Sequence, residues 1–127
     1  MILKLKTKGM RLTPQRLAVI KNLASNYAHP TVEEIYKSVR REFPMTSLAT
    51  VYKTISVLKE MNELVELRSG GQAVRYDAVS GEDHPHLFCV SCRAIQDVDF
   101  PGWDQMAASL QKSTGYQVQR FNMDILG

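Results

Sequence analysis

The sequence predicts an α+β fold in two parts, a helical part with a β-hairpin over residues 1–78 and a smaller α/β part over residues 84–127. Three stretches begin with helix-capping residues and continue with apolar residues at helical spacing. Two runs of alternating polarity then flank a pair of glycines. The charge also changes sign: residues 1–78 contain 13 Lys and Arg against 7 Asp and Glu, whereas residues 79–127 contain 3 against 6.

The first predicted helix begins after Thr13, which suits an N-cap, with Pro14 at the first helical position. It is expected to continue to about Ser25. Its apolar face consists of Leu17, Ile20 and Leu23.

The second predicted helix lies in "HPTVEEIYKSVRREFP", residues 29–44. Thr31 and Glu34 have the spacing of a capping box. Pro44 should end this helix near Glu42 because proline cannot continue it. Its inward-facing residues are Ile35 and Val39.

The third predicted helix, in "TSLATVYKTISVLKEMNE", is capped by Ser47. Its predicted apolar stripe consists of Leu48, Val51, Ile55 and Leu58. Its opposite face carries Ala49, Tyr52, Lys53 and Ser56. A solvated helix face is usually rich in Glu, Lys and Gln, whereas small residues, hydroxyls and a lysine suit the major groove of DNA.

A hairpin is predicted next in "LVELRSGGQAVRYD", with its turn at Gly70 and Gly71. Three helices followed by a hairpin predict a winged helix-turn-helix that binds DNA, with the third helix as the reading helix. A plain three-helix core with a β-ribbon would give the same pattern. The excess of basic residues in this part favours the DNA-binding interpretation, although charge alone fits a solvated surface equally well.

The second part is predicted as short strands in "HLFCV" and "AIQDVD", a helix opened by Pro101 and ended at Gly115, and a last strand in "YQVQRFNMDI" with a bulge near Arg120. The helix face consists of Trp103, Met106, Ala107 and Leu110. So few elements bury too little surface to be stable alone, and an exposed sheet edge invites a second copy. We therefore expect a dimerisation domain, joined to the first part by a hinge at residues 79–83.

No apolar run approaches the roughly 20 residues that a membrane helix needs, and the N-terminus lacks the features of a signal peptide. We expect a cytoplasmic protein without a membrane partner. In that compartment two cysteines are more often metal ligands or redox thiols than a disulfide.

The segment "HPHLFCVSC", residues 84–92, concentrates groups that bind metals. Cys89 and Cys92 have the C-x2-C spacing of zinc ligands, but a closed zinc site needs four ligands and the sequence has no other cysteine. A redox pair, which would require a cysteine at a helix N-terminus, and two small buried thiols are the alternatives. His84 and His86 alternate, so both can reach one metal ion.

Three further residues are candidate partners of these histidines. Asp97 lies on the next predicted strand, and Asp77 lies at the end of the hairpin. Each of these carboxylates, taken alone, is ordinarily solvated. His29 precedes the second predicted helix, where a histidine is ordinarily a loop residue.

The motifs "GMRLTPQR", "HPTVEEIY", "SLATVYKTISVL" and "HPHLFCVSC…IQDVD" resemble, in order and spacing, the ferric uptake regulator (Fur) superfamily of bacterial repressors. The resemblance is strongest to its peroxide-responsive (PerR) branch. It implies a regulatory Fe2+ or Mn2+ site whose ligands are His29, Asp77, His84, His86 and Asp97. Iron-uptake members typically have glutamate at the position of Asp77, so the aspartate favours a peroxide sensor.

The resemblance also bears on the cysteines. Family members normally carry a second C-x2-C after the last strand, which completes a four-cysteine zinc site. The sequence ends at Gly127, where that motif would begin, so either the sequence is truncated there or this member does without structural zinc. Cys89 and Cys92 are therefore predicted as at most part of a Zn2+ site.

The sequence and the resemblance together predict a homodimeric, metal-dependent repressor, not an enzyme, that binds a palindromic operator in double-stranded DNA. The expected DNA contacts are Arg11, Thr50, Tyr52, Lys53 and Ser56. The iron form is expected to sense hydrogen peroxide through oxidation of His29 and His84. The alternatives are an iron- or zinc-uptake regulator of the same superfamily, a C-x2-C thiol oxidoreductase, and a zinc-dependent binding module without metal sensing.

Overall fold

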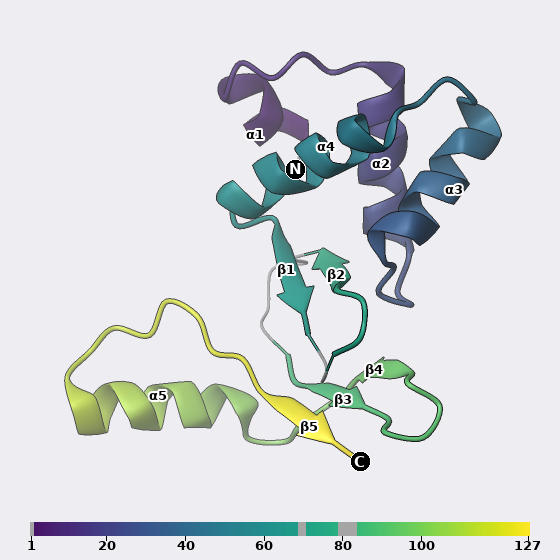
Figure 1. The fold of residues 1–127 in the computed structure, drawn as a ribbon. Coiled ribbons are helices and arrows are strands. Elements are labelled where there is room, and N and C mark those ends of the chain that lie inside the picture. Colours follow the sequence, from purple (N-terminus) through teal and green to yellow (C-terminus); the bar gives the residue numbers. More distant parts are fainter. Residues whose placement is uncertain (1, 69–70, 79–83) are drawn as a thin grey trace. The chain divides into compact units, whose positions relative to one another are not determined.

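A computed structural model describes residues 2–68, 71–78 and 84–127. They belong to two compact units, residues 1–80 and 81–127. The predicted hinge at 79–83 and Gly70 of the predicted turn lie outside the described residues. The fold mixes helices with two small sheets, in agreement with the predicted α+β class (Figure 1).

The first unit contains four helices and a two-stranded antiparallel sheet. The elements are α1 (Ile2–Thr7), α2 (Pro14–Ser25), α3 (Val32–Glu42), α4 (Leu48–Glu60), β1 (Leu64–Leu67) and β2 (Arg75–Ala78). The strands pair with Leu64 opposite Ala78 and Leu67 opposite Arg75. The predicted hairpin is therefore confirmed, with a connection longer than two residues.

The N-termini of α2, α3 and α4 begin where their caps predict. Thr13 accepts a hydrogen bond from the amide of Arg16 at 3.3 Å, and Ser47 accepts one from the amide of Thr50 at 3.1 Å. At α3 the capping box is complete: the Glu34 amide donates to Thr31 Oγ1 at 3.2 Å, and the Thr31 amide donates to Glu34 Oε2 at 2.8 Å. These local bonds satisfy amides that a helix start leaves without partners.

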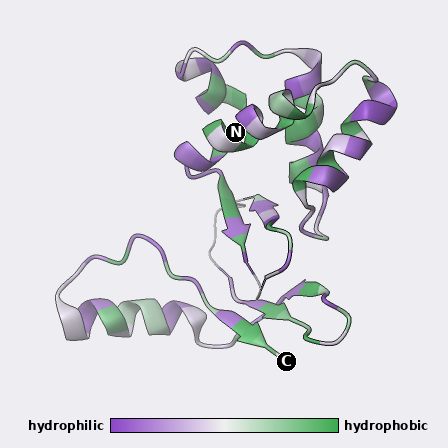
Figure 2. Ribbon diagram, in the orientation of Figure 1, coloured by the Kyte–Doolittle hydropathy of each residue, from purple (hydrophilic) through white to green (hydrophobic). Residues whose placement is uncertain are grey.

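The core of this unit lies between its helices and the hairpin. Figure 2 shows apolar and polar residues alternating along α2, α3 and α4, which allows each helix to turn an apolar side inward. The buried residues are Leu5, Val19, Ile20, Leu23, Val32, Ile35, Val39, Val51, Ile55, Leu58, Leu64 and Tyr76.

The predicted apolar stripe of α4 is wrong at one position, because one of its four residues is not buried. Leu48, the first residue of the helix, is 41% exposed and lines an open pocket beside α3. Thr54 is fully buried instead. Its hydroxyl donates to the carbonyl of Thr50 at 2.8 Å, so the buried polar group is satisfied.

Helix α1 was not predicted. It has six residues, too few to show a clear helical period. Leu5 anchors it in the core, and Lys4 hydrogen-bonds the carboxylate of Glu63. This hydrogen bond lowers the pKa of Glu63 below its usual value.

The second unit contains one helix and a three-stranded mixed sheet. The elements are β3 (His86–Phe88), β4 (Ile95–Asp97), α5 (Trp103–Thr114) and β5 (Asp124–Leu126). The strand order is β4-β3-β5, with β3 antiparallel to β4 and parallel to β5. Helix α5 ends at Gly115 as predicted, because this glycine adopts a left-handed conformation with φ of 73°.

The predicted last strand at residues 116–125 is wrong in length. Strand β5 covers Asp124–Leu126, and residues 116–123 form no strand in which the predicted bulge near Arg120 could lie. The alternating polarity there reflects packing against the helix rather than sheet pairing. Phe121 stacks on Trp103 with the ring centroids 4.4 Å apart.

The second unit buries few side chains. Among its described residues only Pro85, His86 and Phe88 are buried, and α5 has no buried residue at all. Leu110, which shares one predicted face of α5 with Trp103, Met106 and Ala107, is 41% exposed. No helix in the described part of the chain combines the length and apolarity of a membrane span.

Candidate functional site

His29 and Asp77 form a pair in the first unit. His29 is 1% exposed, so it is buried although it lies in the loop before α3, as its place in the sequence predicts. Its Nδ1 lies 3.4 Å from Oδ1 of Asp77, which is in β2. The structure therefore brings together two of the five predicted metal ligands in this unit.

His84, His86 and Asp97 form a group in the second unit. His86 is on the central strand β3, and the antiparallel register places it directly opposite Asp97 in β4. Oδ1 of Asp97 lies 3.1 Å from His84 Nε2 and 3.5 Å from His86 Nε2. The two imidazole rings are 4.7 Å apart, and one donor atom from each of the three residues lies within 4.8 Å of the others.

The donor atoms of both groups suit a divalent transition metal. Imidazole nitrogens bind iron, manganese and zinc, and carboxylate oxygens bind the harder members of that series. Two of the histidines, His29 and His86, are buried, so their imidazoles are shielded from solvent and held in place. Each faces a carboxylate that could share a cation with it. These residues fit the metal site that the sequence predicts.

Cys89 and Cys92 lie in the turn after β3. Both are free thiols, and the amide of Cys92 donates to the sulfur of Cys89 at 3.5 Å. Hydrogen bonds from the backbone of Cys92 and Ser91 lower the pKa of the Cys89 thiol. Such a turn can present two sulfurs to one zinc ion. In the described chain Cys89 follows a strand and does not start a helix. A thioredoxin-like redox pair requires its first cysteine at a helix N-terminus, so the setting of Cys89 does not match that motif.

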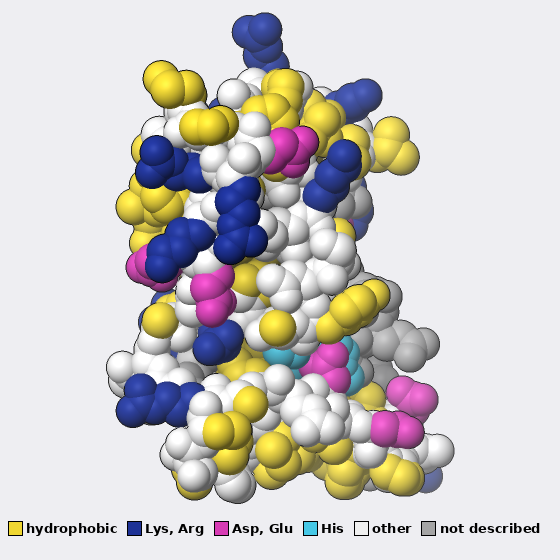
Figure 3. Space-filling view, turned by 90° about the vertical axis from the view of Figure 1, so that its right-hand side faces the viewer, with side chains coloured by type: hydrophobic (Ala, Val, Ile, Leu, Met, Phe, Trp, Pro, Cys, Tyr) yellow, Lys and Arg dark blue, Asp and Glu magenta, His cyan; other side chains and the backbone are white. Residues whose placement is uncertain are grey.

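The predicted DNA-reading face of α4 is accessible. Ala49, Tyr52, Lys53 and Ser56 are exposed, and Thr50 is half-buried. Arg11 is also exposed, and its carbonyl accepts a hydrogen bond from the Arg16 guanidinium at 2.5 Å. Figure 3 shows Lys and Arg side chains spread over the visible face of the first unit, at the top of the view, so basic groups are available for phosphates.

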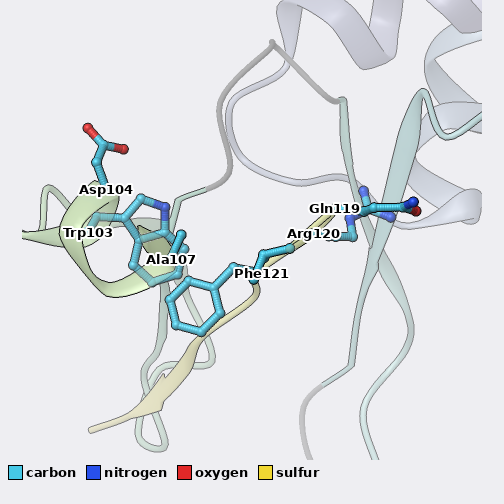
Figure 4. Close-up of a pocket in the computed structure, with 7 residues that line it drawn as sticks. Trp103, Asp104, Ala107, Gln119, Arg120 and Phe121 are labelled. Atoms are coloured by element: carbon cyan, nitrogen blue, oxygen red, sulfur yellow. The ribbon is translucent and has the colours of Figure 1, made fainter. Parts of the chain in front are cut away.

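A separate pocket lies in the second unit (Figure 4). Its volume is about 200 Å³, and the stacked rings of Trp103 and Phe121 form one wall. Asp104 points away from the rings, and Gln119 and Arg120 lie on the opposite side. The residues that line the pocket include no histidine, cysteine or serine.

Comparison with known proteins places this architecture in a family. Residues 7–126 match the model of the ferric uptake regulator family. This chain belongs to the ferric uptake regulator (Fur) family. The predicted resemblance is thereby confirmed over nearly the whole chain.

Several relatives of this Fur-family chain are named for peroxide. The peroxide operon regulator of Bacillus subtilis is 38% identical over 123 residues, which are 97% of this chain and 84% of the relative. The peroxide-responsive repressor PerR of Staphylococcus saprophyticus is 36% identical over 126 residues, 99% of this chain and 84% of the relative. These relatives are regulators or repressors by name.

A solved structure agrees with the fold. The crystal structure of the Campylobacter jejuni peroxide stress regulator superposes with a TM-score of 0.84 at 32% identity, over 100% of this chain and 94% of that one. The mixed helix and strand architecture of this Fur-family chain is therefore the architecture of solved members.

Sequence reasoning missed Arg75. Its Nη1 donates to the carbonyl of His29 at 3.1 Å. Arg75 and Asp77 are two positions apart on β2, so their side chains point to the same side of the strand. That alternation, read together with the predicted ligand role of Asp77, was the signal that could have found it.

Proposed function

We propose that this chain is a homodimeric, metal-dependent transcriptional repressor. The observation that carries the proposal is the pairing of histidines with aspartates, one such group in each unit of a Fur-family chain. The groups contain the five residues that the family resemblance designates as metal ligands. The names of the relatives, which include repressors and regulators of peroxide responses, support the same function.

The proposed regulatory ion is Fe2+ or Mn2+, bound by His29, Asp77, His84, His86 and Asp97 together. Two ligands belong to the first unit and three to the second, so one ion would fix the arrangement of the units. Metal binding and DNA binding then favour the same conformation, and each strengthens the other. Cys89 and Cys92 would contribute two of the four ligands of a separate Zn2+ site.

The first unit would act as a winged helix-turn-helix. In this arrangement α4 enters the major groove, the β1-β2 hairpin is the wing, and Arg11 reaches a minor groove or a phosphate. Two copies reading a palindrome must present their α4 helices about 34–36 Å apart, or a multiple of that distance. The second unit would supply the dimer interface. Two observations support this proposal: helix α5 has no buried residue, and the edges of the three-stranded sheet can pair with a second copy.

Mn2+ titration of the 127-residue protein, followed by calorimetry, tests the metal site. We expect one binding event per chain besides any at the cysteines. The D97A variant should bind Mn2+ at least about tenfold more weakly, because Asp97 faces both His84 and His86. D99A removes an exposed carboxylate two residues further on and should bind as the wild type does. Equal affinity in D97A and wild type would exclude Asp97 as a ligand.

Replacing Tyr52 tests the reading face. The Y52A variant should lose about 1–3 kcal/mol of discrimination between the operator and unrelated DNA, since a contact to a base edge carries sequence information. Competition binding with both DNAs measures the difference. Y27A removes another exposed tyrosine outside α4 and is the matched control. If Y52A weakens binding to both DNAs equally, Tyr52 contacts the backbone or supports packing.

The proposed signal is hydrogen peroxide, sensed in the iron form through His29 and His84. The peroxide regulators among the relatives support this signal, as does aspartate at position 77. An iron- or zinc-uptake regulator would share the fold but would be indifferent to peroxide. The two functions therefore differ in which metal activates the protein and in the response to peroxide.

A further inference from the structure

The backbone of His29 adopts an unusual conformation. Its φ is 53°, in the left-handed region that residues other than glycine rarely enter. Such a conformation is unfavourable and persists only when the surrounding structure enforces it. The neighbours of His29 therefore identify what holds this residue in place.

Strand β2 supplies three consecutive contacts to the segment that contains His29. The Arg75 guanidinium donates to the carbonyl of His29 at 3.1 Å, and the amide of Tyr76 donates to the carbonyl of Pro30 at 3.0 Å. Asp77 faces the His29 ring with 3.4 Å between Oδ1 and Nδ1. The strand thus fixes the backbone on one side of the ring and supplies the carboxylate that the ring faces.

Arg75 is itself held by the first turn of α3. Its Nη1 lies 3.8 Å from Oε2 of Glu34. The same oxygen accepts the hydrogen bond that the Thr31 amide donates in the capping box. A guanidinium is a planar group with several donors and can bond a carbonyl while it remains beside a carboxylate. Arg75 therefore connects the capping box, the His29 carbonyl and the strand of Asp77.

We infer that Arg75 is a positioning residue of the metal site. By bonding the His29 carbonyl it maintains the left-handed backbone that presents the imidazole to Asp77. Arg75 does not touch the metal, and it acts through His29. This inference rests on the proposed metal-dependent function, because positioning matters only if His29 is a ligand.

The test compares three variants of the full chain. R75Q removes the charge and most of the donors, R75K keeps a charge and donors without the planar fork, and R68Q is a matched control that removes an exposed arginine paired with Glu66 in the same hairpin. Mn2+ affinity is measured by titration. In the metal-free protein, NMR reports the His29 imidazole signals and the hydrogen exchange of the Tyr76 amide.

We expect R75Q to bind Mn2+ roughly tenfold more weakly than wild type, with partial recovery in R75K and no change in R68Q. The His29 signals should shift, and the Tyr76 amide should exchange faster, in metal-free R75Q. If R75Q only lowers the unfolding midpoint while Mn2+ affinity and the His29 signals stay at wild-type values, Arg75 is a structural residue and the inference is wrong.

The two readouts also separate this inference from the function on which it rests. A wild-type protein that binds no Mn2+ at His29 would overturn the proposed function. The NMR signals of metal-free R75Q would still show whether Arg75 positions the His29 ring. Unchanged signals in R75Q beside a wild type that binds Mn2+ would overturn the inference alone.

Discussion

Hydrogen peroxide should release the iron-loaded protein from its operator and leave the manganese-loaded protein bound. A bound iron(II) ion would activate the peroxide for reaction with its own histidine ligands, whereas manganese(II) would not readily do so. In the net reaction the O–O bond would break, one oxygen atom would add to a ring carbon of His29 or His84, the other would leave as water, and the imidazole would supply the two electrons. The oxidised ring is a poorer donor, so the ligand set loses a member and DNA affinity falls.

Peptide mass spectrometry identifies where the oxygen goes. The peptides that contain His29 or His84 should each be able to gain one oxygen atom in the iron form and none in the manganese form. Release from DNA with only Cys89 and Cys92 modified would contradict this mechanism and assign the switch to the thiols. Continued binding of the iron form after peroxide would favour an uptake regulator.

Removal of the metal should weaken operator binding by on the order of 100-fold, a coupling at the upper end of the usual range. A titration of a palindromic operator with Mn2+ present and with a chelator present measures this ratio directly. The H29A variant should bind with the chelator-level affinity even when Mn2+ is present, because it lacks one of the two proposed ligands in the first unit.

Two controls accompany this measurement. D99A, which removes an exposed carboxylate outside the ligand groups, should keep the full response to Mn2+. Affinity for unrelated DNA should change little with metal, since it depends mainly on phosphate contacts. Equal operator affinity in metal and in chelator would exclude metal-dependent repression.

Most of the first unit could be predicted because its signals are local. A cap and the helix that follows it are determined by residues three positions apart, as at Thr31 and Glu34. Helix α1 was missed because six residues show no period and its anchor, Leu5, is buried by residues far along the chain. The length of the last strand was overestimated because Phe121 belongs to an alternating apolar pattern but packs on Trp103 instead of facing a sheet partner.

The candidate site could be predicted in part for the same reason. His84 and His86 are two positions apart, and a hairpin places Asp97 opposite His86, so the sequence alone favoured this group. The pairing of His29 with Asp77 joins segments distant in the chain, and only the family resemblance suggested it. The contact of Arg75 with a backbone carbonyl depends on an unusual φ, which no residue pattern specifies.

Because α5 has no residue buried against its own chain, the stability of the proposed dimer would depend on protein concentration. A helix without a buried residue gains little free energy from its own chain, so most of the stability of the second unit would come from association. Each tenfold dilution would then remove about 1.4 kcal/mol from that stability. At the low abundance typical of a repressor, the number of copies in the cell would itself limit how much of the protein is able to repress.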